Sequence, residues 1–172
     1  MESWAVVRRN RRLYFSGPSR TRVHLSSRRK IDICPLLEDL NAVQFPKKYL
    51  RGIKQVQFTL MGKKLYGFYL GGNIWVDTSR KRLRRTILEI FVHEVAHHVH
   101  FEIEQNALKG LARESNKRGH FIHRYVKDDE EEYFARGFER FYSLDTRKRE
   151  SLRRHNPKLY RRISRLHARY AR

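Results

Sequence analysis

The sequence predicts an α+β fold in which a small, mostly antiparallel sheet precedes a long buried helix and a helical C-terminal half. Residues 53–60 alternate apolar and polar side chains with the period of a half-buried strand, and short strand-like runs follow at 65–70 and 73–77. Residues 85–104 then form a nearly continuous apolar run without Gly or Pro, which indicates a buried helix. The change from period two to a long apolar helix carries the prediction.

Local signals predict the elements around this centre. Short extended pieces are expected at 4–7 and 13–15, within a basic N-terminal arm. Turns are expected on either side of the 65–70 strand, a hairpin turn at 61–64 and a second turn at 71–72. Pro35 suits the first turn of a short helix over 36–43, and residues 77–79 offer an N-cap for the central helix. These signals set the boundaries of the N-terminal half.

The C-terminal half is expected to be helical. A helix is predicted at 106–114, and a stronger one at 128–142 has an acidic first turn that suits the positive end of the helix dipole. Asn156 and Pro157 begin a last, Arg-rich helix. Its narrow apolar stripe favours docking on the rest of the chain: Leu159, Ile163, Leu166 and Tyr170.

The central helix contains the sequence His93-Glu94-Val95-Ala96-His97, an HExxH motif. Residues four apart on a helix are neighbours, so His93 and His97 can occupy two corners of a tetrahedral zinc site. Glu94 is placed to take a proton from a metal-activated water. The alternative is a solvated charged face, but unpaired ionisable groups on a buried helix cost several kcal/mol, roughly. His98 and His100 point elsewhere on the helix and are expected to be ordinary polar residues.

A third ligand must come from another segment. The spacing HExxH-x-x-G-x-x-H would require histidine at position 103, where the chain has Ile103. A carboxylate from the 128–142 helix is the remaining option. Glu132 is the best candidate from its position on that helix, and Glu139 is the next.

Composition bounds the class of protein. At 172 residues the chain is long enough for one domain with a real core, and 40% hydrophobic and 12% aromatic residues argue against disorder. The single cysteine, Cys34, excludes an internal disulfide and suits a reducing compartment. No stretch resembles a signal peptide or a membrane span, so a cytoplasmic protein without membrane contact is expected.

The net charge of +21 is concentrated at the two ends. Residues 8–30 carry nine Lys or Arg and no acid, and residues 143–172 carry eleven Lys or Arg against two acids. This distribution favours contact with a polyanion such as nucleic acid, or with an acidic protein. The alternative is a basic surface that only keeps the chain in solution. Oligomeric state is not encoded in any pattern of the sequence.

The motif and its surroundings resemble the lethal-factor-like zinc metallopeptidases, a gluzincin group with a zincin-like fold. The resemblance rests on HExxH at 93–97, on Tyr125, and on Glu132-Tyr133-Phe134-Ala135 seven residues after that tyrosine. It implies one catalytic Zn²⁺ with His93, His97 and Glu132 as ligands. It also implies Glu94 as the general base and Tyr125 as the hydroxyl that stabilises the developing oxyanion.

Two further expectations come from the resemblance. The family usually has a second glutamate four residues after the ligand, where this chain has Arg136, and Glu139 one turn further is a substitute for orienting a histidine ligand. The strand before the central helix resembles the zincin edge strand on which an extended substrate is laid. The residues expected to bind substrate there are Asn73, Ile74, Trp75 and Val76, with core packing as the alternative role of Trp75.

These observations predict a basic arm at 1–30, a metallopeptidase domain at 31–142 and a basic helical extension at 143–172. The expected function is zinc-dependent hydrolysis of a protein or peptide substrate, performed close to nucleic acid. The competing hypothesis is a nucleic-acid-binding or virion-associated structural protein with a vestigial metal site.

Overall fold

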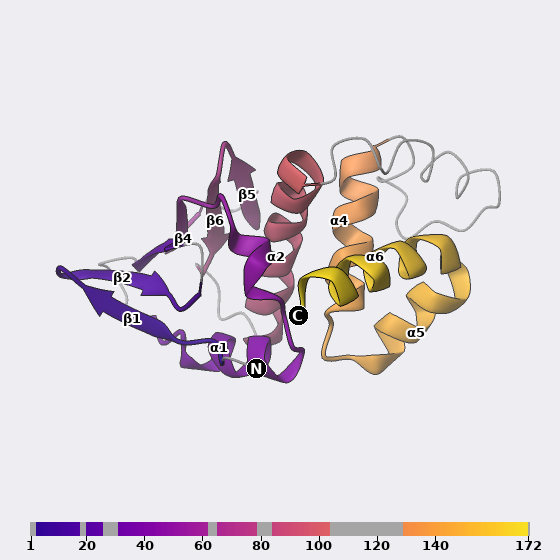
Figure 1. Ribbon diagram of the computed structural model, residues 1–172, viewed down its shortest axis with the longest axis horizontal. Helices are drawn as coiled ribbons and strands as arrows, with labels where there is room; N and C mark the ends of the chain where they lie inside the picture. The colour runs from indigo at the N-terminus through magenta and orange to yellow at the C-terminus, as the bar shows by residue number, and fades with distance from the viewer. Residues whose placement is uncertain are drawn as a thin grey trace.

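The computed structural model describes residues 3–17, 20–25, 31–61, 65–78, 84–103 and 129–171. A six-stranded sheet occupies one side of the molecule and a group of helices the other, with the long helix α2 between them (Figure 1). The elements, in chain order, are β1 (Val6–Arg9), β2 (Arg12–Phe15), β3 (Arg22–Leu25), α1 (Cys34–Ala42), η1 (Lys47–Leu50), β4 (Gln55–Thr59), β5 (Gly67–Leu70), β6 (Asn73–Asp77), α2 (Arg84–His98), η2 (Val99–Ile103), α4 (Glu130–Phe141), α5 (Thr146–His155) and α6 (Pro157–Tyr170).

The sheet has the strand order β1-β2-β3-β4-β6-β5. Three neighbouring pairs are antiparallel, and two pairs, β3 with β4 and β4 with β6, are parallel. The α+β class is therefore confirmed, and the sheet is mostly antiparallel because three of its five strand pairs are antiparallel.

The expected hairpin between β4 and β5 is wrong. β4 pairs with β6, because the chain passes beyond the position of β6 to form the edge strand β5 and then turns back at Gly71 and Gly72. Both glycines have positive φ, +52° and +85°, which favours glycine in this tight return. β5 is consequently an edge strand, and β6 has a partner on each side.

The N-terminal residues do not form a separate arm in the part of the chain that the structure describes. β1, β2 and β3 supply half of the strands, and β3 had no clear signal in the sequence. These strands are four residues long and rich in arginine, so their periodicity is too short to distinguish a strand from a loop.

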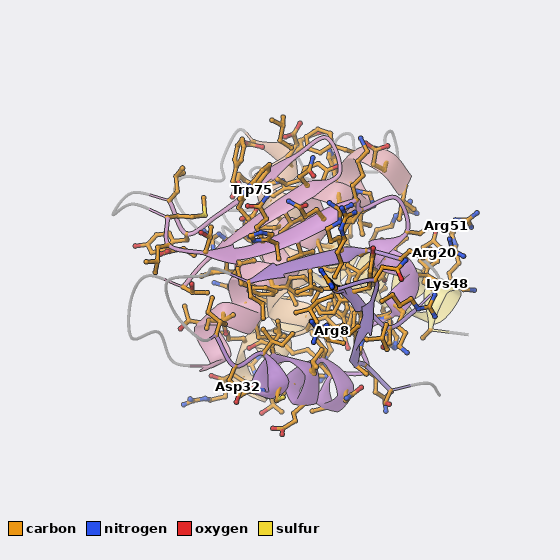
Figure 2. The ribbon with its side chains drawn as sticks, turned by 90° about the vertical axis from the view of Figure 1, so that its left-hand side faces the viewer. Arg8, Arg20, Asp32, Lys48, Arg51 and Trp75 are labelled. Atoms are coloured by element: carbon orange, nitrogen blue, oxygen red, sulfur yellow. The ribbon has the colours of Figure 1, made fainter. Side chains whose placement is uncertain are left out.

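The core lies between one face of the sheet and α2. β4 alternates as the sequence predicts, with Val56 and Phe58 buried, and Ile74 and Val76 of β6 lie beside them. Phe91 of α2 packs against Phe58 at a ring-centroid distance of 6.3 Å. No helix of the described ranges lies on the other face of the sheet, onto which Figure 2 looks.

The two helices that matter for the site agree with the sequence. α2 continues into a π-helical turn, so helical structure covers 84–103 as expected. Asp129 caps α4, since its side chain accepts hydrogen bonds from the backbone N–H groups of Glu131 and Glu132 at 3.0 Å. α4 lies alongside α2 (Figure 1). Among the described residues, no helix is both long and apolar enough to cross a membrane.

The C-terminal segment docks on α4. Leu159, Ile163 and Leu166 of α6 are buried, as their stripe predicts, and Tyr170 contacts the ring of Tyr49 at 5.5 Å between centroids. α5 is an additional helix that the sequence analysis missed. Its N-cap, Asp145, accepts a hydrogen bond from the backbone N–H of Arg147, but its composition is otherwise too polar to stand out.

α4 and α6 approach each other closely at Gly137. A Cβ atom at this position would lie 3.0 Å from Leu159 Cγ. We expect Gly137→Ala to lower the free energy of unfolding by about 1–2 kcal/mol, because overpacking outweighs the better helix propensity of alanine. Chemical denaturation of Gly137→Ala, Leu159→Ala and the double variant tests this. The double variant should lose less stability than the sum of the two; strict additivity would contradict the contact.

Candidate metal centre

Two histidines of α2 form the base of the site. His93 and His97 lie one helical turn apart, and their Nε2 atoms are 3.2 Å from each other. The backbone of this part of α2 is held rigidly, because Val92, Val95 and Ala96 are buried in the core. The core-facing side of the helix therefore fixes the position of both imidazoles.

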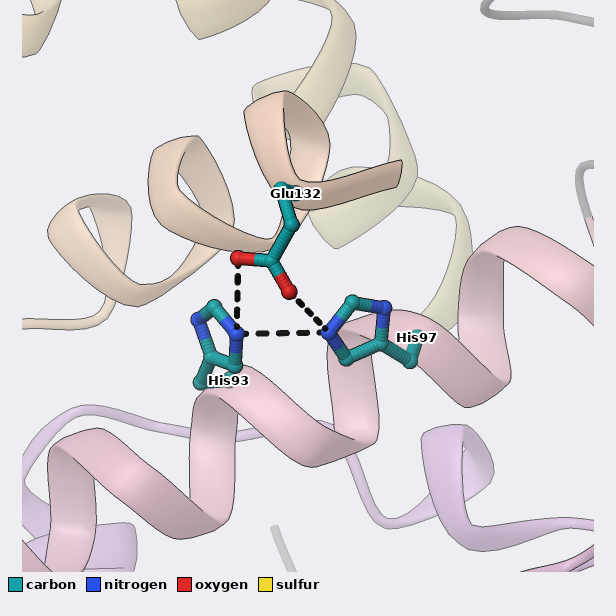
Figure 3. Close-up of side chains that lie close together, drawn as sticks. All are labelled: His93, His97 and Glu132. Carbon is teal, nitrogen blue, oxygen red and sulfur yellow. Dashed lines mark hydrogen bonds and ion pairs between the residues drawn. The ribbon is translucent and has the colours of Figure 1, made fainter. Parts of the chain in front are cut away.

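Glu132 brings a carboxylate to the same point from α4. Its Oε2 lies 3.5 Å from His93 Nε2, and its Oε1 lies 3.2 Å from His97 Nε2 (Figure 3). The Asp129 cap holds the first turn of α4, from which Glu132 projects between the two rings. Side chains 35 or more residues apart in the sequence thus converge on one place.

The three side chains form a triangle in which each imidazole Nε2 faces a different oxygen of Glu132. Metal–ligand distances of 2.0–2.1 Å in a tetrahedral zinc site imply separations of about 3.3 Å between ligand atoms. The two imidazole Nε2 atoms are 3.2 Å apart, and one atom from each of the three side chains lies within 4.8 Å of the other two, so the group is close enough to share one ion. Among the described residues, His93, His97 and Glu132 are the one group of His, Cys, Asp or Glu whose atoms are arranged to hold a metal ion.

His93 and Glu132 shift each other's pKa values in opposite directions. Burial by itself lowers the pKa of His93, but hydrogen bonding to Glu132 and Glu139 outweighs burial and raises the pKa to about 9. The pKa of Glu132 is lowered well below its ordinary range by hydrogen bonds from the two imidazoles. Glu132 is thus ionised, in the state required of a metal ligand.

Glu139 lies on the far side of the first histidine. Its Oε2 is 3.4 Å from His93 Nδ1, the nitrogen that does not face the triangle. Arg136 pairs with the same oxygen at 2.9 Å. Burial raises the pKa of Glu139, but His93 and Arg136 together hold it below its ordinary value. Glu139 therefore contacts the His93 nitrogen that faces away from Glu132, and Arg136 pairs with the same carboxylate oxygen.

Glu94 and the edge strand β5 meet at the site. Glu94 is buried, and burial raises its pKa against the opposing effect of the two histidines. A Cβ atom at Gly67 of β5 would lie 2.8 Å from the carboxyl carbon of Glu94. β5 therefore passes directly beside the Glu94 carboxyl group, and a side chain at position 67 would require that carboxyl group to shift.

A cavity of about 370 Å³ opens between these groups. Its wall includes the start of β5, the HExxH helix and α4, with the residues Leu65, Tyr66, Gly67, Thr86, Glu89, Ile90, His93, Glu94, Glu132, Arg136 and Glu139. Two of the candidate metal ligands, His93 and Glu132, therefore share one opening with Glu94 and the start of the edge strand.

The prediction that the strand before α2 lies at the edge of the sheet is wrong. β6, which contains Asn73, Ile74, Trp75 and Val76, is flanked by β4 and β5, so its backbone is already paired on both sides. Ile74 and Val76 are fully buried in the core, and the alternation of the strand turns Asn73 and Trp75 to the opposite face of the sheet. The backbone edge nearest the cavity belongs to β5.

Other predicted residues lie apart from the triangle or outside the described residues. His98 is buried and bonds the Tyr69 hydroxyl at 3.1 Å and the Arg51 carbonyl at 2.9 Å, so it links α2 to two neighbouring segments. His100 is likewise not part of the triangle. Tyr125 and the helix predicted at 106–114 lie outside the described residues.

The fold and the site define an α+β domain that carries a candidate centre of two histidines and one glutamate. Comparison with known families shows which domain this is. Residues 43–166 match the model of the family described as anthrax toxin lethal factor, N- and C-terminal domain, and this match covers well over half of the chain. The chain therefore belongs to that family, and the lethal-factor-like relationship predicted from the sequence is confirmed. No curated protein matches the sequence.

Proposed function

We propose that this chain is a zinc-dependent endopeptidase. The observation that carries the proposal is the convergence of His93, His97 and Glu132, with Glu94 lining the same cavity as His93 and Glu132. Membership of the lethal factor family is compatible with a protease-related role. Two imidazoles and one carboxylate are a common protein ligand set of catalytic zinc sites, which keep a fourth position open.

The proposed roles follow from the geometry of each side chain. Zinc, when bound by His93, His97 and Glu132, would supply a Lewis acid that polarises a peptide carbonyl and acidifies water. Glu94 accepts the proton of the attacking water and delivers it to the leaving amine. Its raised pKa suits both transfers, since a carboxyl group that takes up and returns a proton works best when its pKa approaches the operating pH.

The substrate is proposed to lie along β5. Its outer backbone edge is unpaired within the described sheet and runs beside Glu94, so an extended peptide can add a strand there. Leu65 and Tyr66 are more than half exposed next to this edge and line the cavity. Tyr125 remains the proposed donor to the oxyanion, where one such hydrogen bond contributes about 3 kcal/mol.

We expect Glu139→Gln to weaken zinc binding by about 10- to 100-fold, because the amide no longer holds His93 through a charged contact. Competition with a chromogenic chelator measures the affinity. Arg154→Gln, an exposed charge on α5, is the matched control and should bind zinc as the parent does. Unchanged zinc affinity in Glu139→Gln would show that Glu139 does not position the histidine.

We expect Gly67→Ala to reduce cleavage by about 10- to 100-fold with normal zinc content, because the added methyl group displaces the Glu94 carboxyl and misplacement of a reacting group carries penalties of this size. Leu70→Ala on the same strand is the control, since Leu70 is exposed and turned away from α2. Full activity in Gly67→Ala would contradict the assigned position of the general base.

Cleavage of a peptide library by the zinc-loaded chain, with and without a chelator, tests the proposed function. We expect peptide bonds to be cut, cleavage to stop with the chelator, and activity to return with added zinc. If the zinc-loaded chain cleaves no library member, the competing hypothesis of a binding protein with a vestigial site replaces the enzyme.

A further inference from the structure

Among the residues that the structure describes, no helix covers the sheet face opposite α2. Strand register places Val7, Tyr14, Arg22, Gln55, Asn73 and Leu70 in one row across the sheet. A second row contains His24, Gln57, Trp75 and Phe68. These side chains are partly or fully exposed. The two rows therefore form a broad surface that is available to a partner.

The strands that form the open face carry no exposed carboxylate. The chain contains no Asp or Glu between Glu2 and Asp32 or between Asp39 and Asp77. Within the six strands as the structure defines them, the one carboxylate is Asp77, which is buried and accepts a hydrogen bond from the backbone N–H of Met61. No carboxylate of these strands therefore offsets their arginines.

Basic side chains lie on the β1–β3 part of the face and at one margin of the sheet. Arg9 and Arg12 are paired across the β1–β2 hairpin, on the same side of the sheet as Tyr14 and Arg22. Figure 2 shows Arg20, Lys48 and Arg51 gathered at one margin of the sheet, with Trp75 at the other side. The positive charge therefore continues from the first strand to the segment that precedes β4.

Aromatic side chains share the open face with these basic side chains. Phe68 and Trp75 are register partners whose ring centroids are 5.7 Å apart, and Phe68 is 44% exposed. Tyr14 stands on β2, separated from β6 by β4 and β3, and is paired with Arg22. Polar amides of Gln55, Gln57 and Asn73 separate the aromatic groups. The face thus combines ring surfaces, hydrogen-bonding groups and cations on one plane.

We propose that this sheet face binds single-stranded nucleic acid. Unpaired bases expose ring surfaces that stack on aromatic side chains, while arginines neutralise the phosphates. The Watson–Crick edges of such bases can bond the amides between the strands. A duplex conceals its ring surfaces, and an acidic protein does not need an aromatic centre, so both fit the face less well.

The proposal does not depend on peptidase activity. The binding face lies on the opposite side of the sheet from α2 and Glu132, and no candidate metal ligand contributes to it. It also differs from the basic α5–α6 surface, which lies at the other end of the molecule (Figure 1). One test can therefore separate the two basic regions.

Fluorescence anisotropy of labelled 20-nucleotide single-stranded DNA and RNA, measured with the full chain over a salt series, tests the proposal. Trp75→Ala is expected to weaken binding about 5- to 150-fold, the range for loss of one stacking partner. In the parent chain, nucleic acid that stacks on Trp75 should quench tryptophan fluorescence. Trp75→Phe should retain binding but lose this quenching. Circular dichroism of both variants establishes that they are folded, and Phe68→Ala provides a second stacking variant on the edge strand.

Charge variants supply the matched control. Replacing Arg9, Arg12 and Arg22 together by glutamine should reduce the slope of log affinity against log salt by about 2. The same replacement of Arg154, Arg161 and Arg165 on α5 and α6 should leave the slope unchanged. Equal loss in the two triple variants, tighter binding of a duplex, or equal binding of polyglutamate would overturn the proposal.

Discussion

Glu94→Gln is expected to lower peptide cleavage about 10²- to 10⁴-fold while the chain keeps its full zinc content. Glutamine has nearly the same shape as glutamate but cannot accept the proton of the attacking water. Glu94 is not one of the three ligand residues, so its replacement leaves the metal triangle intact. Initial rates on the best library peptide, together with zinc content by mass spectrometry, measure both quantities.

Glu102→Gln provides the control for this experiment. Glu102 is exposed in η2, after the HExxH segment, and does not line the cavity. It should retain cleavage. If Glu94→Gln cleaves as fast as the parent, another group accepts the proton, and the role assigned to Glu94 is wrong.

Glu132→Ala is expected to weaken zinc binding more than about 100-fold, a larger loss than that caused by removing a residue that only orients a ligand. Two imidazoles on one helix would remain, without the ligand that joins α2 to α4. Zinc at 100 times its dissociation constant should stabilise the parent by about 2.7 kcal/mol, which corresponds to about 5–10 °C in melting temperature. Melting curves with and without zinc should show this increase in the parent and none in Glu132→Ala.

Glu131→Ala is the matched control for the ligand. Glu131 lies in the same first turn of α4, one residue from Glu132, and is not part of the triangle. It should retain the zinc-dependent increase in melting temperature. Retention of the increase by Glu132→Ala would exclude Glu132 as the third ligand.

The helix that carries the site could be predicted from the sequence because its signal is local. HExxH fixes two ligand positions through helical periodicity alone, and the apolar run around it predicts burial. The sequence made Glu132 the leading candidate for the third ligand, because the acidic start of α4 offers only a few carboxylates. The choice between Glu132 and Glu139 needed the packing of α4 on α2, which places one glutamate at each side of His93.

The sheet was harder to predict because strand order is a nonlocal property. The alternation in β4 and the two glycines before β6 identify strands and a turn, but they do not tell which strand lies at the edge. Because the sequence analysis paired β4 with β5, it placed β6 rather than β5 at the edge of the sheet, where a substrate strand would add. The contact between Gly67 and Glu94 also had no sequence signal, since it depends on how β5 crosses α2.

The account depends most on one metal ion held by side chains from α2 and α4. Anomalous diffraction at the zinc absorption edge, from crystals of the zinc-loaded chain, tests this directly. We expect one strong peak about 2.0–2.1 Å from His93 Nε2, from His97 Nε2 and from a carboxylate oxygen of Glu132. A peak at other residues, or no peak between the two imidazoles, would contradict the account.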